Sequence, residues 1–264
     1  MLSKNLIRLV RQLDTHKGRR RAGLFVAEGP RLVGELLGHF SCVRLVATAE
    51  WADTFAQQQR VSPIPDLPAI ELVTPEELCR LSLLSTPQQV LAVLRIPEYT
   101  FEPERACSQL TLVLDGVQDP GNVGTIVRLA DWFGVEDIWC SPQTADVWNP
   151  KAVQASMGGL ARVRVHYINI LSALASLPSH VPVYSTSLQG RVLWDAPLSA
   201  EGGVIVMGNE GNGVSPEVAA VCHERLLIPN YPEGRLSTES LNVAMATGIV
   251  LAEFRRRAVS SLHS

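Results

Sequence analysis

The sequence predicts an α/β protein with a larger C-terminal domain built on a parallel sheet and a smaller N-terminal α/β domain. From residue 110 onward, short and almost wholly apolar segments alternate with helical ones, which is typical of a parallel sheet covered on both faces. The stretch 96–108 (IPEYTFEPERACS) carries prolines and charges but no hydrophobic periodicity, which indicates a linker. A length of 264 residues also suits two domains. We expect domains at 1–97 and 109–264, with a linker at 98–108.

The N-terminal domain is expected to open with a helix at 4–13, which a basic turn follows. A second helix, at 30–37, begins with Pro30, whose missing N–H costs nothing in a first turn. Thr74, followed by Pro75 and two glutamates, signals a further helix. The expected strands of this domain lie at 24–26, 43–47, 71–73 and 90–94.

The C-terminal domain is expected to alternate strands and helices along its whole length. Its predicted strands lie at 111–115, 138–140, 181–186, 203–207 and 225–229. Its predicted helices lie near 124–133, 152–157 and 241–257. Because ligands of open α/β sheets bind at the carboxyl ends of the strands, we expect the functional site at that edge.

The composition describes a soluble globular chain, with 46% hydrophobic and 19% charged residues. No uncharged apolar run approaches the roughly 20 residues that span a bilayer, and the N-terminus lacks the pattern of a secretory signal. A cytoplasmic location is therefore expected. No metal site or disulfide is expected, and buried thiols are expected instead, because there is no CxxC among the widely spaced cysteines 42, 79, 107, 140 and 222.

Positive charge is concentrated near the N-terminus. Residues 1–31 hold eight basic and two acidic side chains, a net +6 that leaves −9 for the rest of a chain whose total is −3. Such a local patch can attract RNA whatever the overall charge, although a solubilising helix face is the alternative. The candidate RNA-binding residues are Lys17, Arg19, Arg20, Arg21 and Arg31.

The first motif follows the predicted strand 111–115 and reads DPGNVGTIVR. A glycine-containing connection from strand to helix presents backbone N–H groups to a ligand. The motif matches neither the dinucleotide fingerprint GxGxxG nor a phosphate-binding GKS/GKT loop. Asn122 and Arg128 are its candidate functional residues. A left-handed turn residue is the alternative for Asn122, and a surface charge is the alternative for Arg128.

Two further motifs follow later strands. Gly208, Gly211 and Gly213 surround Glu210 after the strand 203–207, and they allow a ligand to approach the backbone closely. Glu210 could grip a hydroxyl group or an arginine, or be a loop surface charge.

After Ile228-Pro229 a polar loop leads to Ser240-Leu241-Asn242, which is expected to open the last helix. Ser240 as a helix cap is the alternative to a functional role.

The order of these motifs resembles the SpoU (TrmH-like) branch of the knotted SPOUT methyltransferases. The resemblance covers the second domain through the segments 119–128, 207–211, 228–229 and 240–243. Residues 19–31 (RRRAGLFVAEGPR) are similar, more weakly, to the family's L30e-like substrate-binding extension. The resemblance implies a trefoil knot, a homodimer formed through the C-terminal domains, and methyl transfer from S-adenosyl-L-methionine to a ribose 2′-hydroxyl of structured RNA. Ribosomal RNA is favoured over tRNA.

The resemblance also implies which residues carry the reaction. The catalytic set is Asn122, Arg128, Glu210, Ser240 and Asn242, and the cofactor set is Gly208, Ile228, Leu241 and Ser240. In this chain the loop from 228 to 240 looks longer than in typical relatives, and SLNVAMA replaces the usual SLNVSVA.

We expect Asn122 and Asn242 to hydrogen-bond around the reacting ribose, and Glu210 to orient Arg128 or the knotted loop. Because a guanidinium is a poor proton acceptor, Arg128 is expected to clamp the ribose or a phosphate, with general-base catalysis as the alternative.

Three other functions stay open at this point. An RNA base methyltransferase would share the cofactor, and a non-catalytic RNA-binding or ribosome-assembly protein could keep the fold. A nucleotide-dependent dehydrogenase is the third, and the missing glycine fingerprint disfavours it.

Overall fold

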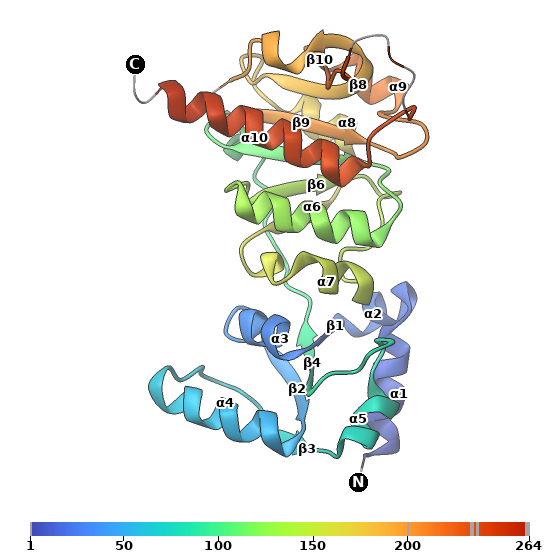
Figure 1. Cartoon of the computed structure of the whole chain (residues 1–264), viewed down its shortest axis with the longest axis vertical. Helices are drawn as coiled ribbons and strands as arrows, with labels where there is room; N and C mark the ends of the chain where they lie inside the picture. Colours follow the sequence, from blue (N-terminus) through green and yellow to red (C-terminus); the bar gives the residue numbers. More distant parts are fainter. Residues whose placement is uncertain (1, 200, 233–234, 236–237, 262–264) are drawn as a thin grey trace. The chain divides into compact units, whose positions relative to one another are not determined.

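The computed structural model describes residues 2–199, 201–232, 235 and 238–261, with side chains described to residue 258. The chain forms two compact units (Figure 1). Unit 1 comprises Met1–Glu98 with Asp146–Ala161, and unit 2 comprises Tyr99–Ala145 with Arg162–Ser264. The first boundary lies at the start of the expected linker. The segment 146–161, which we expected in the C-terminal domain, instead belongs to unit 1.

Unit 1 is built on a four-stranded sheet in the order β1-β4-β2-β3. Its pairings are antiparallel except β2 with β3, which is parallel. The strands are β1 (Leu24–Glu28), β2 (Cys42–Ala47), β3 (Ile70–Leu72) and β4 (Val90–Arg95). The helices are α1 (Lys4–Leu13), α2 (His16–Ala22), α3 (Pro30–Leu36), α4 (Ala49–Val61), α5 (Pro75–Leu81) and α7 (Pro150–Ser156). Apolar residues of α1 and α5 pack on one face of this sheet.

Local capping explains several helix boundaries in unit 1. The Thr74 hydroxyl accepts from the backbone N–H of Glu77, whose carboxylate accepts in return from Thr74 N–H, a capping box. The expected basic turn after α1 is wrong, because these residues form helix α2. Thr15 caps its start and Gly23, in a left-handed conformation, ends it.

Aromatic packing and a buried ion pair hold the segment 146–161 in unit 1. The ring of Trp148 lies 4.7 Å from that of Phe25 and 6.0 Å from that of Phe40, centroid to centroid. The guanidinium of Arg19 donates to the carboxylate of Asp146, with Nε at 2.8 Å. These contacts are long-range, so the local sequence around residue 146 carries no sign of them.

Unit 2 contains a six-stranded sheet in the order β10-β8-β9-β5-β6-β7. Every pairing is parallel, as expected. The strands are β5 (Leu110–Asp115), β6 (Asp137–Cys140), β7 (Arg164–Tyr167), β8 (Val183–Val192), β9 (Gly203–Gly208) and β10 (Glu224–Leu227). The helices are α6 (Pro120–Trp132), α8 (Ile170–Ala175), α9 (Pro216–Ala220) and α10 (Val243–Ser261).

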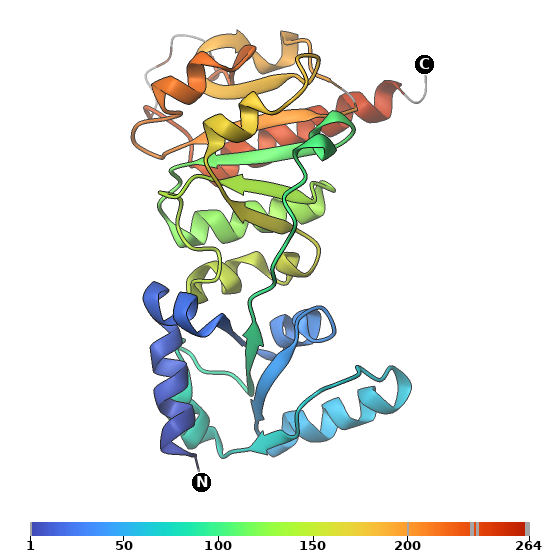
Figure 2. The same ribbon diagram turned by 180° about the vertical axis from the view of Figure 1, so that it is seen from behind.

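Helices cover both faces of the sheet in unit 2. Helices α6 and α10 lie together on the face toward the viewer in Figure 1, whereas α8 and α9 cover the opposite face, seen in Figure 2. Valines of the central strands pack against Ile170, Leu174 and Val218 on the second face. This double cover explains why the strands read as continuous apolar runs.

The second half of the expected linker is anchored on unit 2. It contains a short 3-10 helix, η1 (Pro103–Cys107), from which Arg105 donates to Asp137 and Glu136 at the start of β6. Burial alone would raise the pKa of Asp137, but hydrogen bonds from Arg164, His166 and Arg105 hold it well below its usual range. The linker is therefore partly ordered by ion pairs.

The expectation of buried thiols holds only for Cys140. Cys79 is exposed, and the others are half-buried. Within the described residues there is no group of three or more His, Cys, Asp or Glu side chains that could hold a metal ion. Among the same residues, no helix is both long enough and apolar enough to cross a membrane.

Candidate functional site

The first two motifs meet because their strands are neighbours. Strand β5 pairs with β9 in parallel, and the register places Asp115 opposite Gly208 at the carboxyl ends of the two strands. The loops that follow therefore leave the sheet side by side. The Nδ2 of Asn209 donates to the carbonyl of Gly116 at 2.8 Å, which joins them directly.

The first motif starts helix α6 four residues earlier than expected. Asp119 is the N-cap, and its Oδ1 accepts from the backbone N–H of Asn122 at 2.9 Å. Asn122 thus sits in the first helical turn, which excludes the left-handed turn as its explanation. The signal missed in the sequence was Asp119 directly before Pro120, a typical start of a helix.

The glycines of the second motif are required by a tight loop. A Cβ on Gly208 would lie 2.1 Å from the carbonyl carbon of Gly213, so only glycine fits. Gly213 has a φ of +70°, and its backbone exchanges two hydrogen bonds with Asn209. The Oδ1 of Asn209 also accepts from the backbone N–H groups of residues 211 and 212. We had not singled out Asn209, and it is the residue that shapes this loop.

Glu210 binds the first motif. Its carboxylate accepts from Nδ2 of Asn122 at 2.9 Å and from the backbone N–H groups of Gln118 and Asp119 at 3.2 and 3.4 Å. Partial burial would raise the pKa of Glu210, but these hydrogen bonds lower it overall. The carboxylate is therefore ionised at neutral pH and fixes the start of α6.

The third motif joins through Asn242. Its Nδ2 donates to Oδ1 of Asn122 at 3.0 Å, while its own Oδ1 accepts from the N–H groups of Ala244 and Met245. Asn242, rather than Ser240, therefore caps α10. A continuous chain of hydrogen bonds runs from Asn242 through Asn122 to Glu210, and it brings together residues 120 positions apart in the sequence.

Two members of the expected catalytic set stand outside this chain of bonds. Arg128 is exposed and lies six residues beyond Asn122 on α6, about 9 Å along the helix axis. Among the described residues it forms no ion pair with Glu210, so the expected Arg128–Glu210 contact is not observed. Ser240 is exposed, and within the same part of the chain it makes no hydrogen bond with the other site residues.

The expected cofactor residues follow two strand ends and the start of a helix. Gly208 is the last residue of β9 and is buried, while Ile228 comes directly after β10 and is half-buried. Leu241 precedes the cap of α10 and is 51% exposed, unusually high for a large apolar side chain. Leu241 adjoins Asn242, and Gly208 opens the loop that carries Glu210.

One of the five predicted RNA-binding residues has a structural role instead. Arg19 is 2% exposed, pairs with Asp146 and donates to the carbonyls of Leu13 and Asp14. Its guanidinium is thus unavailable to a phosphate, and the expectation for Arg19 is wrong. The remaining candidates, which are Lys17, Arg20, Arg21 and Arg31, are exposed.

Comparison with protein families assigns both parts of the chain. Residues 109–252 match the family described as the SpoU rRNA Methylase family. Residues 4–92 match a domain described as the MRM3-like substrate binding domain.

Individual relatives agree with the family match. The 23S rRNA (guanosine(2553)-2'-O)-methyltransferase RlmP of Bacillus subtilis is 29% identical over 246 residues, covering 93% of this chain and 94% of that protein. A solved structure from Porphyromonas gingivalis, described under the TrmH family of RNA methyltransferases, is 45% identical with a TM-score of 0.86, covering 97% of this chain and 99% of that one. The AdoMet bound rRNA methyltransferase from Sinorhizobium meliloti is 26% identical with a TM-score of 0.81, covering 97% and 96%.

Proposed function

The chain belongs to the SpoU rRNA methylase family, and on this premise we propose that it transfers a methyl group from S-adenosylmethionine to a ribose 2′-hydroxyl of ribosomal RNA. The relatives named above include a 23S rRNA 2′-O-methyltransferase and a structure with the cofactor bound. The observation that carries the proposal is the hydrogen-bonded chain Asn242–Asn122–Glu210, because it assembles all three motifs at the ligand-binding edge of the sheet.

The residues at this edge fit the cofactor. The tight loop at Gly208 exposes backbone rather than side chains, which suits hydrogen bonding to a nucleoside. The half-exposed Leu241 offers apolar surface to a flat base. We assign cofactor contacts to Gly208, Ile228 and Leu241, with Ser240 supporting the loop. When bound, S-adenosylmethionine supplies a methyl group on a positively charged sulfur, and that sulfur departs neutral.

The side chains of the chain of bonds would position the ribose. Asn122 and Asn242 use one donor and one acceptor on each other and on Glu210, and their amides keep further hydrogen-bonding capacity for ribose hydroxyls. Glu210 is engaged by three donors, so its role is to hold Asn122 in place. Correct orientation of the hydroxyl is a large part of such catalysis.

Arg128 is proposed to clamp the ribose or an adjoining phosphate. A guanidinium stays protonated and donates in a fixed planar geometry, so it suits binding an anion better than accepting a proton. Because Arg128 is exposed and lies about 9 Å along α6 from Asn122, we propose that it acts in the site of a second copy of the chain.

A homodimer through unit 2 would make that arrangement possible. Large apolar side chains are exposed on the two helices that share one face of the sheet: Trp132 on α6 is 83% exposed and Met245 on α10 is 64% exposed. Apolar surface of this kind is more often covered than left in water. We propose that these helices contribute to the dimer interface.

The trefoil knot is also proposed here. Strand β10 lies at the edge of the sheet, whereas α10 packs against α6, which follows the central strand β5. The chain between them must return toward the centre past the loops of the first two motifs. The bond from Asn242 to Asn122 supports a path through those loops.

Unit 1 is proposed to bind the RNA, with Lys17, Arg20, Arg21 and Arg31 contacting phosphates. Those four cations are exposed, and phosphate contacts dominate the affinity of proteins for nucleic acids. We keep 1–97 as the RNA-binding domain and 109–264 as the methyltransferase domain, with the correction that 146–161 belongs to unit 1. Ribosomal RNA is a cytoplasmic substrate, so that location stays a prediction.

The proposal is tested by incubating the purified protein with labelled S-adenosylmethionine and either unmodified 23S ribosomal RNA or bulk unmodified tRNA. We expect label in the ribosomal RNA alone. Label in tRNA alone would contradict the choice of substrate. Binding of the cofactor without transfer to either RNA would favour a non-catalytic RNA-binding protein.

A further inference from the structure

The outer face of α1 carries positive charge that is not neutralised. Lys4, Arg8 and Arg11 are exposed and separated by four and three residues, so they lie in one row along the helix. The helix contains no acidic residue. Among the described residues Lys4 and Arg8 form no ion pair and no side-chain hydrogen bond. Arg11 donates to the backbone carbonyl of Arg80, which leaves its charge in place.

Folding does not explain this row. The opposite face of α1 buries Leu6, Val10 and Leu13, and this contact with the sheet is what holds the helix. Like charges at spacings of three and four residues destabilise a helix, so the row opposes the fold slightly. Such a row is typical of a surface that meets a polyanion.

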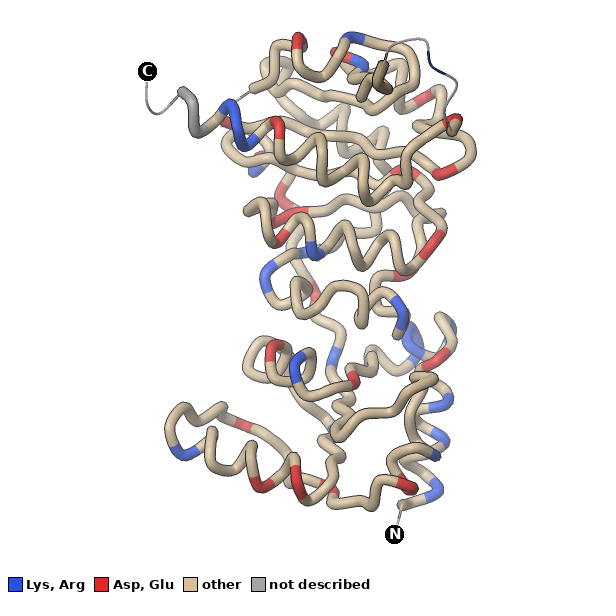
Figure 3. The backbone as a smooth tube through the Cα atoms, viewed as in Figure 1, with Lys and Arg blue, Asp and Glu red and all other residues tan. Residues whose placement is uncertain are grey.

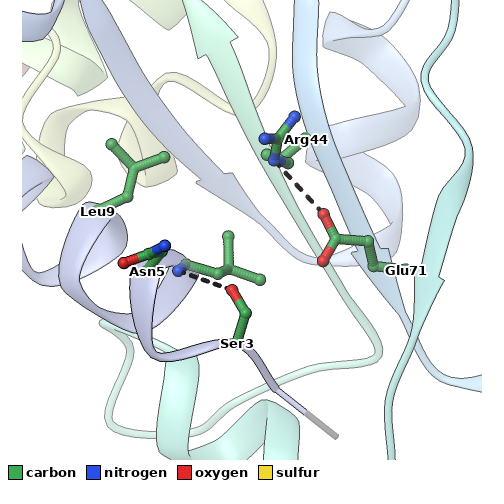
Figure 4. Close-up of a pocket in the computed structure, with 6 residues that line it drawn as sticks. Ser3, Asn5, Leu9, Arg44 and Glu71 are labelled. Atoms are coloured by element: carbon green, nitrogen blue, oxygen red, sulfur yellow. Dashed lines mark hydrogen bonds and ion pairs between the residues drawn. The ribbon is translucent and has the colours of Figure 1, made fainter.

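A groove lies beside the start of the row. It has a volume of about 220 Å³ and is lined by Ser3, Asn5, Leu6, Leu9, Arg44 and Glu71, which come from α1 and its N-terminus, β2 and β3. We call it the α1 groove (Figure 4). Leu6 and Leu9 form its apolar wall. Asn5 brings an amide, and Arg44 and Glu71 bring opposite charges, with Nε and Oε1 only 3.5 Å apart.

We propose that α1 and the α1 groove bind an unpaired nucleotide of the RNA substrate, with its base in the groove and the neighbouring phosphates on Lys4, Arg8 and Arg11. This inference rests on the proposed function. Proteins read single-stranded RNA by taking an unstacked base against apolar or guanidinium surfaces and bonding its edges. The groove offers an apolar wall, donors on Arg44 and an acceptor on Glu71.

The row also continues into the basic residues already assigned to RNA. Helix α2 packs against α1 and presents Lys17, Arg20 and Arg21 to solvent. Figure 3 shows the Lys and Arg positions following α1 and passing onto α2. The two helices therefore form one basic surface within unit 1, and the groove lies next to its N-terminal end.

Three double variants of the full chain test this inference. Lys4→Ala/Arg8→Ala removes two charges from the row, and Asn5→Ala/Arg44→Gln removes groups from the groove. The matched control is Arg60→Ala/Arg95→Ala, which removes two exposed charges from α4 and from the end of β4, away from α1. For each protein, the Kd for unmodified 23S ribosomal RNA is measured between 0.05 and 0.5 M salt, as is the Kd for S-adenosylmethionine.

We expect both the row and the groove variants to weaken RNA binding while leaving the cofactor Kd unchanged. Each lost phosphate contact reduces the salt slope by about 0.7 for single-stranded RNA, which corresponds to about fivefold in Kd at 0.1 M salt relative to 1 M. The row variant should therefore lose about 25-fold in affinity and about 1.4 in slope. The groove variant should lose affinity without the full change in slope, and the control should match the wild type.

Row and groove variants that bind the RNA as tightly as the control overturn the inference. If they also methylate normally, the proposed function stands and the surface serves another partner, such as a ribosomal protein. A wild-type protein that binds S-adenosylmethionine and RNA but transfers no methyl group would contradict the proposed function alone.

Discussion

At the scale of single residues, the site depends on one amide. Asn122 accepts from Asn242 and donates to Glu210, so it is the only one of the three that touches both others. Its position follows from Asp119, which caps α6 and places Asn122 in the first turn. The three motifs are thereby held at a shared point although each comes from a different loop.

Replacing Asn122 with alanine should reduce kcat about a hundredfold, because both the hydroxyl partner and the link between the motifs are lost. The cofactor Kd should change little, because the loop at Gly208 is shaped by Asn209. Single-turnover methyl transfer measures the effect. Asn212→Ala, an exposed asparagine in the adjacent loop, is the control and should keep full activity. A fully active Asn122→Ala variant would remove the residue from the site.

Glu210 makes a second prediction at this scale. Its folded-state pKa is lowered, so its hydrogen bonds stabilise the protein at pH values above the ordinary pKa of 4.5, and this stabilisation is lost as the pH falls through the folded value. Glu210→Gln should therefore be less stable than wild type at pH 7, and the difference should shrink below pH 4.5. Urea unfolding at pH 7 and pH 3.5 measures it. A difference that grows in acid would contradict the assigned bonds.

At the scale of elements, the segment 146–161 and helix α2 are joined by the Arg19–Asp146 pair. Arg19 is buried, and its other donors reach the carbonyls at the end of α1. One side chain thus connects α1, α2 and the segment that carries α7. The pair is a fold determinant rather than part of the RNA surface.

Arg19→Ala should destabilise the protein by about 3 kcal/mol, because removal of one partner leaves Asp146 uncompensated. Arg20→Ala, an exposed neighbour on the same helix, should change the unfolding free energy by less than about 0.5 kcal/mol. Urea denaturation compares them. Equal, small effects would return Arg19 to the list of RNA contacts.

The sequence predicted those elements that carry a strong local signal. The bounds of α1 were predicted from its apolar spacing, and α5 from Thr74 and the glutamates after it. Helix α4 was missed because its segment is polar and only Trp51 and Phe55 are buried. The motif residues were found by resemblance, whereas Asp119 and Asn209 act through local backbone bonds that periodicity does not reveal. The placement of 146–161 depends on contacts with Phe25 and Arg19, far away in the sequence.

At the scale of the whole molecule, the account depends on pairing between chains. Arg128 projects from α6 without a partner among the described residues, and the adjacent helices expose Trp132 and Met245. A symmetric dimer through α6 and α10 would cover these rings and chains. It would also bring a second Arg128 toward each site.

Mixing inactive Arg128→Ala and Asn242→Ala proteins should restore activity if Arg128 serves the other chain. Half of the dimers are then mixed and one of their two sites is intact, so about a quarter of wild-type activity is expected. Sedimentation should give twice the chain mass of 28.8 kDa. No restoration between subunits that do exchange would place Arg128 in the site of its own chain.

The identity of the methylated atom tests the central claim most directly. Ribosomal RNA methylated by the wild-type protein is digested to nucleosides, and the product is identified by mass spectrometry of the base and sugar fragments. The account predicts a methyl group on the ribose, at a nucleotide that resists alkaline cleavage because its 2′-oxygen is blocked. A methyl group on the base would keep the fold and the cofactor but contradict the assignment of Asn122 and Asn242 to the ribose.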